Sequence, residues 1–111
     1  MDHPHRVPLH VQIQGDEMLI VLDKPFEQWC DRWTPVLIGR YVGPFRTVRI
    51  DCSRCNRLTS AFFAGAIHLR QTYGPKATVV LDQLDPSLLR GLAAMRIEGL
   101  FTVVTRAPAG A

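Results

Sequence analysis

The alternation of apolar and polar residues near the start of the chain predicts a β-hairpin. From Leu9 to Gln14, apolar side chains at Leu9, Val11 and Ile13 alternate with polar ones, which is typical of a strand with one buried face. The Gly-Asp dipeptide that follows is typical of a tight turn. Beyond the turn, Met18–Leu22 is a continuous apolar run, which indicates a second and more deeply buried strand.

The segment from Asp23 to Trp33 has two interpretations. Its aromatic residues belong in a core, yet prolines at positions 25 and 35 bracket them. Thr34 before a proline is a favourable helix start, which predicts a helix over Val36–Val42 that ends at a Gly-Pro pair. A start at Asp23 would instead give two helices or one kinked helix, and both alternatives stay open.

Two strands with a helix between them are predicted in the middle of the chain. Arg46–Asp51 has the composition of a strand, and a polar loop, Cys52–Leu58, follows it. A Thr-Ser pair then precedes a predicted helix over Ala61–Tyr73, which stops at a Gly-Pro pair. Ala77–Leu81 is the next predicted strand.

A last helix and a short strand are predicted near the end. Asp85 followed by Pro86 is an N-cap and first-turn pair for a helix that runs to about Arg96, with Gly99 as its terminator. Leu100–Val104 is predicted to form a short final strand.

This order of elements predicts one α/β domain. Strands separated by helices of this length imply right-handed crossovers and a mostly parallel sheet of four to five strands with helices packed on it. We expect the domain to span residues 9–105, between a flexible N-terminal segment at 1–8 and a flexible tail at 106–111.

Length and composition agree with a single domain. The chain has 111 residues and a mass of 12.5 kDa, and 47% of its residues are hydrophobic. No stretch approaches the roughly 18 uninterrupted apolar residues that a membrane span requires. The N-terminus has no basic flank followed by an apolar run, so a cytoplasmic protein is expected.

Arginine dominates the positive charge. The net charge is +3, and only Lys24 and Lys76 are lysines. The bias favours phosphate or carboxylate contacts, and it equally suits a GC-rich genome. Five arginines close together make nucleic-acid binding an alternative function: Arg46, Arg49, Arg54, Arg57 and Arg70. Arg46 and Arg49 have an odd separation within one strand and should point to opposite faces, which argues against one basic patch.

The cysteines and histidines do not form a recognisable catalytic or metal motif. Cys52 and Cys55 have C-x-x-C spacing, but a zinc site would need a second ligand pair that the sequence lacks. With Cys30, they are expected to be ordinary packed thiols. Three histidines fall in the first ten residues, and His68 lies in mid-helix. Glycine-rich phosphate loops are absent, so we expect no enzyme, metal or cofactor.

The strongest candidate for chemistry is the loop before the predicted central helix. Thr59 and Ser60 stand at the helix start, where a hydroxyl normally caps free backbone amides. If the hydroxyl were phosphorylated instead, the same amides and the helix dipole would favour the phosphate. Arg54 and Arg57 lie just upstream and are suited to charge-assisted contacts with it.

Four segments carry a resemblance to a known family. Val48–Ser53 is similar to a family strand that ends in Asp-Leu-Ser, and Asn56–Phe63 stands where the family has Asp-Ser-Ser-Gly-Leu. Tyr73–Leu81 is similar to the next strand, and Pro86–Phe101 to a last helix with a Leu, Gly-Leu and Phe ending. The chain thus resembles the STAS domain family of bacterial anti-anti-sigma factors, most clearly over Val48–Val104.

The resemblance implies a STAS-like fold and a non-enzymatic role in regulating transcription. The family's phosphorylated residue maps onto Ser60, with Thr59 as a second candidate. The implied partner is a kinase-like anti-sigma factor that phosphorylates this hydroxyl with ATP. The unphosphorylated protein binds that factor and frees the sigma factor. Added charge at a helix start within an interface would reset the binding.

Two departures from the family motif imply an alternative partner. Thr59 stands where the family has Asp, and Phe62 stands where it has Gly. These changes suit a constitutive adaptor that docks on the ATPase of a phospholipid-trafficking ABC transporter, or a stress-signalling scaffold. In either case the expected partner-binding residues are Arg54, Asn56, Arg57, Thr59, Ser60, Ala61, Phe62 and Ala64. The oligomeric state is left open.

Overall fold

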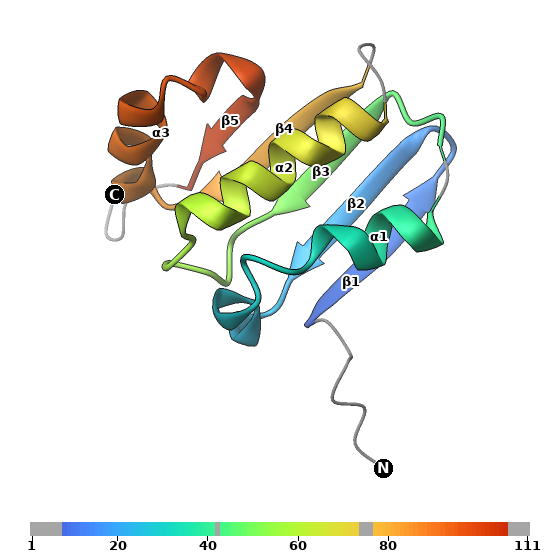
Figure 1. Ribbon diagram of the computed structural model, residues 1–111, viewed down its shortest axis with the longest axis horizontal. Helices are drawn as coiled ribbons and strands as arrows, with labels where there is room; N and C mark the ends of the chain where they lie inside the picture. The colour runs from blue at the N-terminus through green and yellow to red at the C-terminus, as the bar shows by residue number, and fades with distance from the viewer. Residues whose placement is uncertain (1–7, 42, 74–76, 107–111) are drawn as a thin grey trace.

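The computed structural model describes residues 8–41, 43–73 and 77–106, and within them it contains a five-stranded sheet (Figure 1). The sheet order follows the chain order. The strands are β1 (Leu9–Gln14), β2 (Glu17–Leu22), β3 (Thr47–Asp51), β4 (Thr78–Leu84) and β5 (Thr102–Thr105). β1 pairs antiparallel with β2, and the other three pairings are parallel. The prediction of a mostly parallel α/β sheet is therefore confirmed.

Helices occupy the connections between the parallel strands. The α-helices are α1 (Thr34–Arg40), α2 (Ser60–Thr72) and α3 (Leu89–Met95). Short 3₁₀ helices are η1 (Lys24–Gln28), η2 (Pro86–Leu88) and η3 (Glu98–Leu100). α1 and α2 lie side by side over the same face of the sheet (Figure 1).

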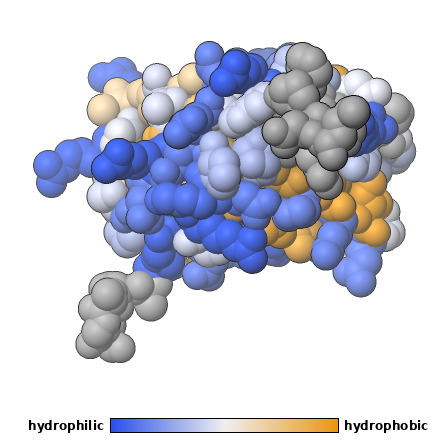
Figure 2. All heavy atoms as spheres, turned by 90° about the horizontal axis from the view of Figure 1, so that it is seen from below, coloured by the Kyte–Doolittle hydropathy of each residue, from blue (hydrophilic) through white to orange (hydrophobic). Residues whose placement is uncertain are grey.

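The two faces of the sheet differ in burial because strand residues alternate. On β2, Met18, Ile20 and Leu22 point toward the helices and are completely buried. The opposite face carries the half-buried Leu19 and Val21. Figure 2 shows the molecule from below the view of Figure 1. The surface on this side is mostly hydrophilic, and hydrophobic residues gather at its right, where β1 and β2 lie.

Three aromatic rings connect η1, the start of α1 and α2 to one another. The ring of Trp33, which directly precedes α1, stacks on Phe62 of α2 with centroids 5.4 Å apart. Phe26 of η1 meets both rings edge-on, at 5.4 Å from Trp33 and 5.8 Å from Phe62. All three side chains are buried. Because such contacts add to the burial of large apolar surfaces, this cluster holds η1, α1 and α2 together.

The ambiguous segment forms two separate helices, η1 and α1, as one of the two sequence interpretations allowed. α1 begins at Thr34 and ends at Arg40, earlier than the predicted helix over Val36–Val42. Pro25 and Pro35 each occupy a first-turn position, where a missing amide proton costs nothing.

The end of the chain differs from the sequence prediction in four ways. The final strand, β5, begins at Thr102 rather than at Leu100, which lies in η3. β4 continues to Leu84 rather than Leu81, past an irregularity at Gln83 with φ 56°. The last α-helix is shorter at its start, because Pro86–Leu88 forms the 3₁₀ helix η2 and α3 begins only at Leu89. Its end agrees with the prediction of about Arg96, since α3 ends at Met95 and Arg96 takes the left-handed conformation with φ 58°. Gly99 is therefore not the helix terminator, and it lies in η3 instead. The predicted cap is confirmed, since the Asp85 carboxylate accepts the amide of Ser87 at 3.1 Å.

Pro8 and Arg106 belong to the folded part of the chain. The carbonyl of Pro8 accepts the amide of Asp23 at 3.0 Å. The amide of Arg106 donates to the carbonyl of Leu84 at 3.0 Å, although the sequence placed this residue in the tail. The rest of the predicted flexible termini, 1–7 and 107–111, lies outside the described residues.

α2 approaches Trp33 closely only because residue 65 is glycine. A Cβ built on Gly65 would lie 2.6 Å from Nε1 of Trp33 and 3.0 Å from Cγ2 of Thr34. We expect Gly65→Ala to lower the free energy of unfolding by about 1–3 kcal/mol, because the buried indole has no room to move. The measurement is urea denaturation followed by tryptophan fluorescence.

Gly91→Ala in α3 is the matched control. Nothing lies within 4 Å of a Cβ at this position, so we expect stability to rise by up to about 1 kcal/mol from helix propensity alone. Equal effects of the two substitutions would contradict the close-approach explanation.

Candidate functional site

The site predicted from sequence is an exposed surface at the carboxyl end of β3. It consists of the loop 52–58 between β3 and α2, together with the first turns of α2. Several side chains on it are exposed: Arg54, Asn56, Arg57, Thr59, Ser60 and Ala64, with Ala61 half-buried. We call this set of residues the loop–α2 surface. The carboxyl ends of parallel strands are where α/β sheets usually meet ligands and partners.

Glu27 of η1 holds the loop from one side. Its Oε2 atom accepts the backbone amides of Asn56 and Arg57 at 2.7 and 2.8 Å, and Nζ of Lys24 donates to the same atom at 3.2 Å. Desolvation by burial tends to raise the pKa of Glu27. The two amide bonds and the Lys24 charge outweigh it, so the pKa lies below its ordinary value. The carboxylate therefore remains ionised and bound to the loop at neutral pH.

Arg106, just beyond β5, holds the loop from the other side. Its Nη2 atom donates to the carbonyls of Cys52 and Cys55 at 2.9 and 2.8 Å. Nη1 donates to Oδ1 of Asn56 at 2.7 Å, and Nε donates to the carbonyl of Gln83 at 3.1 Å. The planar guanidinium is suited to several acceptors at once, and here it ties β4 to the loop.

Asp23 provides a further attachment. Its Oδ1 accepts Nη1 of Arg54 at 2.7 Å, and its Oδ2 lies 2.9 Å from Nε2 of His10. Within the loop, Oδ1 of Asp51 accepts the amide of Ser53 at 2.9 Å. The loop is thus attached to Asp23, to η1 and, through Arg106, to β4, so its exposed side chains stand on an ordered backbone.

The start of α2 leaves its hydroxyl groups exposed. Thr59 is the N-cap residue, with an extended backbone at φ −87° and ψ 172°, and Ser60 is the first helical residue. The side chain of Thr59 does not form the capping hydrogen bond that is usual for a hydroxyl at this position. Both residues are exposed.

Phe62 does not belong to this surface, which corrects one of the predicted partner-binding residues. Its ring is completely buried and stacks on Trp33. The helical period turns this position toward the sheet and turns Ala64 outward. The bulk of Phe62 therefore fills the core, and the exposed positions in the first turns of α2, Ser60 and Ala64, carry small side chains.

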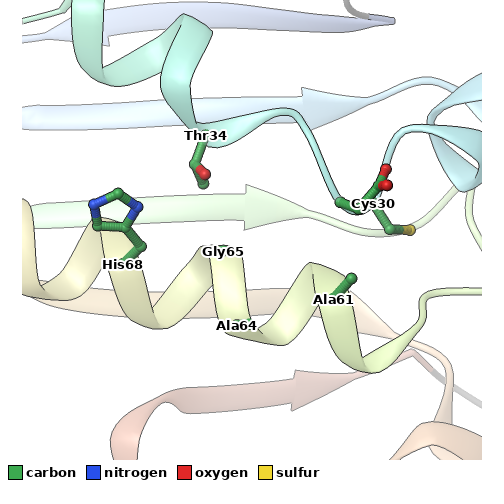
Figure 3. A pocket seen from close by; sticks show the side chains of 7 residues that line it. Cys30, Thr34, Ala61, Ala64, Gly65 and His68 are labelled. Atoms are coloured by element: carbon green, nitrogen blue, oxygen red, sulfur yellow. The ribbon is translucent and has the colours of Figure 1, made fainter.

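A groove of about 280 Å³ runs beside the exposed face of α2. Ala61, Ala64 and Gly65 line it from α2, while Thr34 and His68 extend toward each other from α1 and α2 (Figure 3). Cys30 and Asp31 complete its lining. Ala61 and Ala64 were among the partner-binding residues expected from sequence. The groove residues outside α2 were not, because only the packing of α1 against α2 brings the two segments together.

Three of the five arginines that suggested nucleic-acid binding have carboxylate partners. Nε of Arg46 lies 3.5 Å from Asp16. Arg49 lies 3.7 Å from Glu17 and 3.4 Å from Asp82, and Arg54 is bound to Asp23. Their charge is locally balanced, which weakens the case for a basic surface that would bind phosphates.

Two further findings concern the described part of the chain only. Among residues 8–41, 43–73 and 77–106, no three His, Cys, Asp or Glu side chains are grouped to hold a metal ion. No helix described here has the length and apolar character needed to cross a membrane.

The comparisons with known proteins show the fold and nothing finer. No protein-family model matches the chain, and no curated protein matches it. The chain is similar to the NMR structure of the protein TM1081, with a TM-score of 0.60 and 13% sequence identity. The match covers 96% of this chain and 86% of that one. The likeness supports an α/β fold over nearly the whole chain.

The attachment of the loop through Glu27 should depend on pH. Because the folded-state pKa is lowered, the stabilisation is fully present above the ordinary glutamate pKa of about 4.3 and is lost as the pH falls through the folded-state value. We expect Glu27→Gln to be less stable than wild type at pH 7, and the difference to shrink toward pH 3. Urea denaturation at a series of pH values measures this, and a pH-independent difference would contradict it.

The thiols should be unreactive in the folded protein. Cys52 and Cys55 are completely buried. Burial raises the pKa of Cys55 to about 11 and that of Cys52 further, so almost no thiolate exists at neutral pH. We expect iodoacetamide at pH 7.5 to label both residues only after urea is added, as read by mass spectrometry. Rapid labelling of the native protein would revive a redox function.

Proposed function

We propose that this protein is a non-enzymatic STAS-like regulator that binds a protein partner through the loop–α2 surface. The observation that carries the proposal is the fixation of loop 52–58 by Glu27 and Arg106 from two sides. A surface that is ordered before binding loses less conformational entropy when a partner docks. The small side chains of α2 beside it allow a partner backbone to approach closely.

In this proposal, the partner is an anti-sigma factor of the kinase-like type, and Ser60 is the residue that it phosphorylates. The support is chemical and positional. Ser60 is exposed at the start of a 13-residue helix, and the Thr59 hydroxyl beside it is not used for capping. A phosphate here would bring about 1.5–2 negative charges into the centre of the docking surface. The bound partner would then be released by repulsion and desolvation.

The alternative is a constitutive adaptor for an ABC-transporter ATPase or a stress-signalling scaffold. The specific observation in its favour is Thr59, since no carboxylate precedes Ser60 to assist phosphoryl transfer. Both versions use the same loop–α2 surface, and they differ only in whether Ser60 acts as a switch.

Substitution of Ala64 tests the docking surface. Tagged protein is used to capture partners from a bacterial lysate, and the captured proteins are identified by mass spectrometry. The exposed Ala64 of α2 is replaced by Arg, and the exposed Ala94 of α3 provides the matched control, Ala94→Arg. We expect Ala64→Arg to weaken binding of the captured partner more than tenfold, which is about 1.4 kcal/mol, while Ala94→Arg binds as wild type. Unchanged binding by Ala64→Arg would refute the proposed surface.

The switch is tested on the same captured partner. We expect Ser60→Glu to lose binding and Ser60→Ala to retain it, and ATP with the partner to place a phosphate on Ser60. If both variants bind equally and no phosphate appears, the switch is refuted and the adaptor version stands.

A further inference from the structure

In the described part of the chain, the outer edge of β1 is an unpaired strand edge, and β1 itself lacks the features that usually discourage pairing. β1 is six residues long and pairs with β2 in an unbroken register. Among the described residues no strand pairs with its other side. The strand contains no lysine, proline or bulge, which are the features that normally discourage edge pairing. The opposite edge strand, β5, is four residues long and its pairing with β4 is irregular.

The hydrogen bonds of the hairpin determine which backbone groups of β1 point outward. The amide of Asp23 donates to the carbonyl of Pro8, and Gln14 pairs with Glu17 across a two-residue turn. In an antiparallel ladder, bonded and non-bonded pairs alternate. The even-numbered residues of β1 therefore bond to β2. The amides and carbonyls of Leu9, Val11 and Ile13 point to the free edge.

These outward groups match those of a second copy in one register. If two β1 strands run antiparallel about a twofold axis at Val11, then Val11 faces its own copy and Leu9 faces Ile13 of the other chain. Each of these residues directs its amide and carbonyl at the other strand, which allows six backbone hydrogen bonds. A twofold axis at Gln12 would place inward-pointing groups opposite each other.

The same register also matches the side chains. Leu9, Val11 and Ile13 lie on the helix-covered face, opposite the buried Leu22, Ile20 and Met18 of β2. Pairing at Val11 places apolar residues against apolar ones and His10 against Gln12 on the other face. Ile13 is 47% exposed, and hydrophobic residues gather on the surface on this side of the molecule (Figure 2). α1 covers β1 and β2 on this side, so pairing would also bring two α1 helices together (Figure 1).

We propose that β1 is a self-association edge, at which a second copy of this chain pairs antiparallel about Val11. The product is a twofold dimer with one continuous sheet of ten strands, because each chain supplies five. The partner is a second copy because both the backbone groups and the side chains of this one strand are self-complementary. The loop–α2 surface takes no part in this contact, so the proposal does not depend on the proposed function.

Disulfide cross-linking tests the register. His10 and Gln12 are exposed, and in the proposed dimer they form a non-hydrogen-bonded pair with Cα atoms about 4.5 Å apart, within disulfide reach. We expect a mixture of the His10→Cys and Gln12→Cys proteins to form a disulfide-linked dimer under mild oxidation, and each protein alone to remain largely uncross-linked. The native cysteines are buried and do not compete. The mixture of His10→Cys with Gln14→Cys is the register control. These two positions would face each other only if the twofold axis lay at Gln12.

Sedimentation velocity over a wide range of concentrations tests the association itself. We expect a species of twice 12.5 kDa at high concentration. Ile13→Lys should raise the dissociation constant more than tenfold, because a charge would face Leu9 of the other copy. The matched control is Val104→Lys on β5, where the side chain is 41% exposed, and it should leave the dissociation constant unchanged.

Three results would overturn the proposal. A protein that remains monomeric at all concentrations has no such edge contact. Equal effects of Ile13→Lys and Val104→Lys would place the contact elsewhere. Cross-linking in the control mixture, without cross-linking of His10→Cys to Gln12→Cys, would contradict the register.

Discussion

The packing of Phe26, Trp33 and Phe62 is the contact on which the rest of the structure depends. These rings come from η1, from the residue before α1 and from α2, three segments that no backbone ladder connects. Their burial requires α2 to approach Trp33 at Gly65, where a side chain would not fit. Once Phe26 is buried, Glu27 beside it is directed at the loop before α2. The apolar core thereby positions the polar anchor of the candidate site.

The anchors of the loop illustrate how neutral backbone groups and charged side chains complement each other. A turn between a strand and a helix leaves amides and carbonyls without ladder partners. Glu27 satisfies two of the amides, and Arg106 satisfies two of the carbonyls. Both charged side chains bind backbone groups of the loop, so loop 52–58 is ordered while the side chains of Arg57, Thr59 and Ser60 remain exposed to a partner.

The two proposed contacts use different physical interactions at separate places. The loop–α2 surface presents side chains, and its recognition would depend on charge and on the small residues of α2. The edge of β1 presents backbone groups, and its recognition would depend on strand register. A dimer through β1 would carry two copies of the loop–α2 surface, which would allow bivalent binding to an oligomeric partner.

The sequence by itself determined the class of fold and the position of the exposed loop. Local signals were sufficient for this: the apolar alternation of β1, the Gly-Asp turn, and the proline and Asp85 caps all act within a few residues. The position of the loop, between the carboxyl end of β3 and the start of α2, followed from the order of elements along the chain.

Only the tertiary structure decided which residues of the site are accessible and what holds them. Phe62 was expected at the surface and lies in the core, because the direction of a residue on a nearly all-apolar helix depends on what packs against it. Glu27 and Arg106 lie about 30 and 50 residues from Asn56, so no local pattern revealed them as anchors. Arg106 was assigned to a tail for the same reason. Contacts between distant segments depend on the packed core, and a local sequence pattern does not contain them.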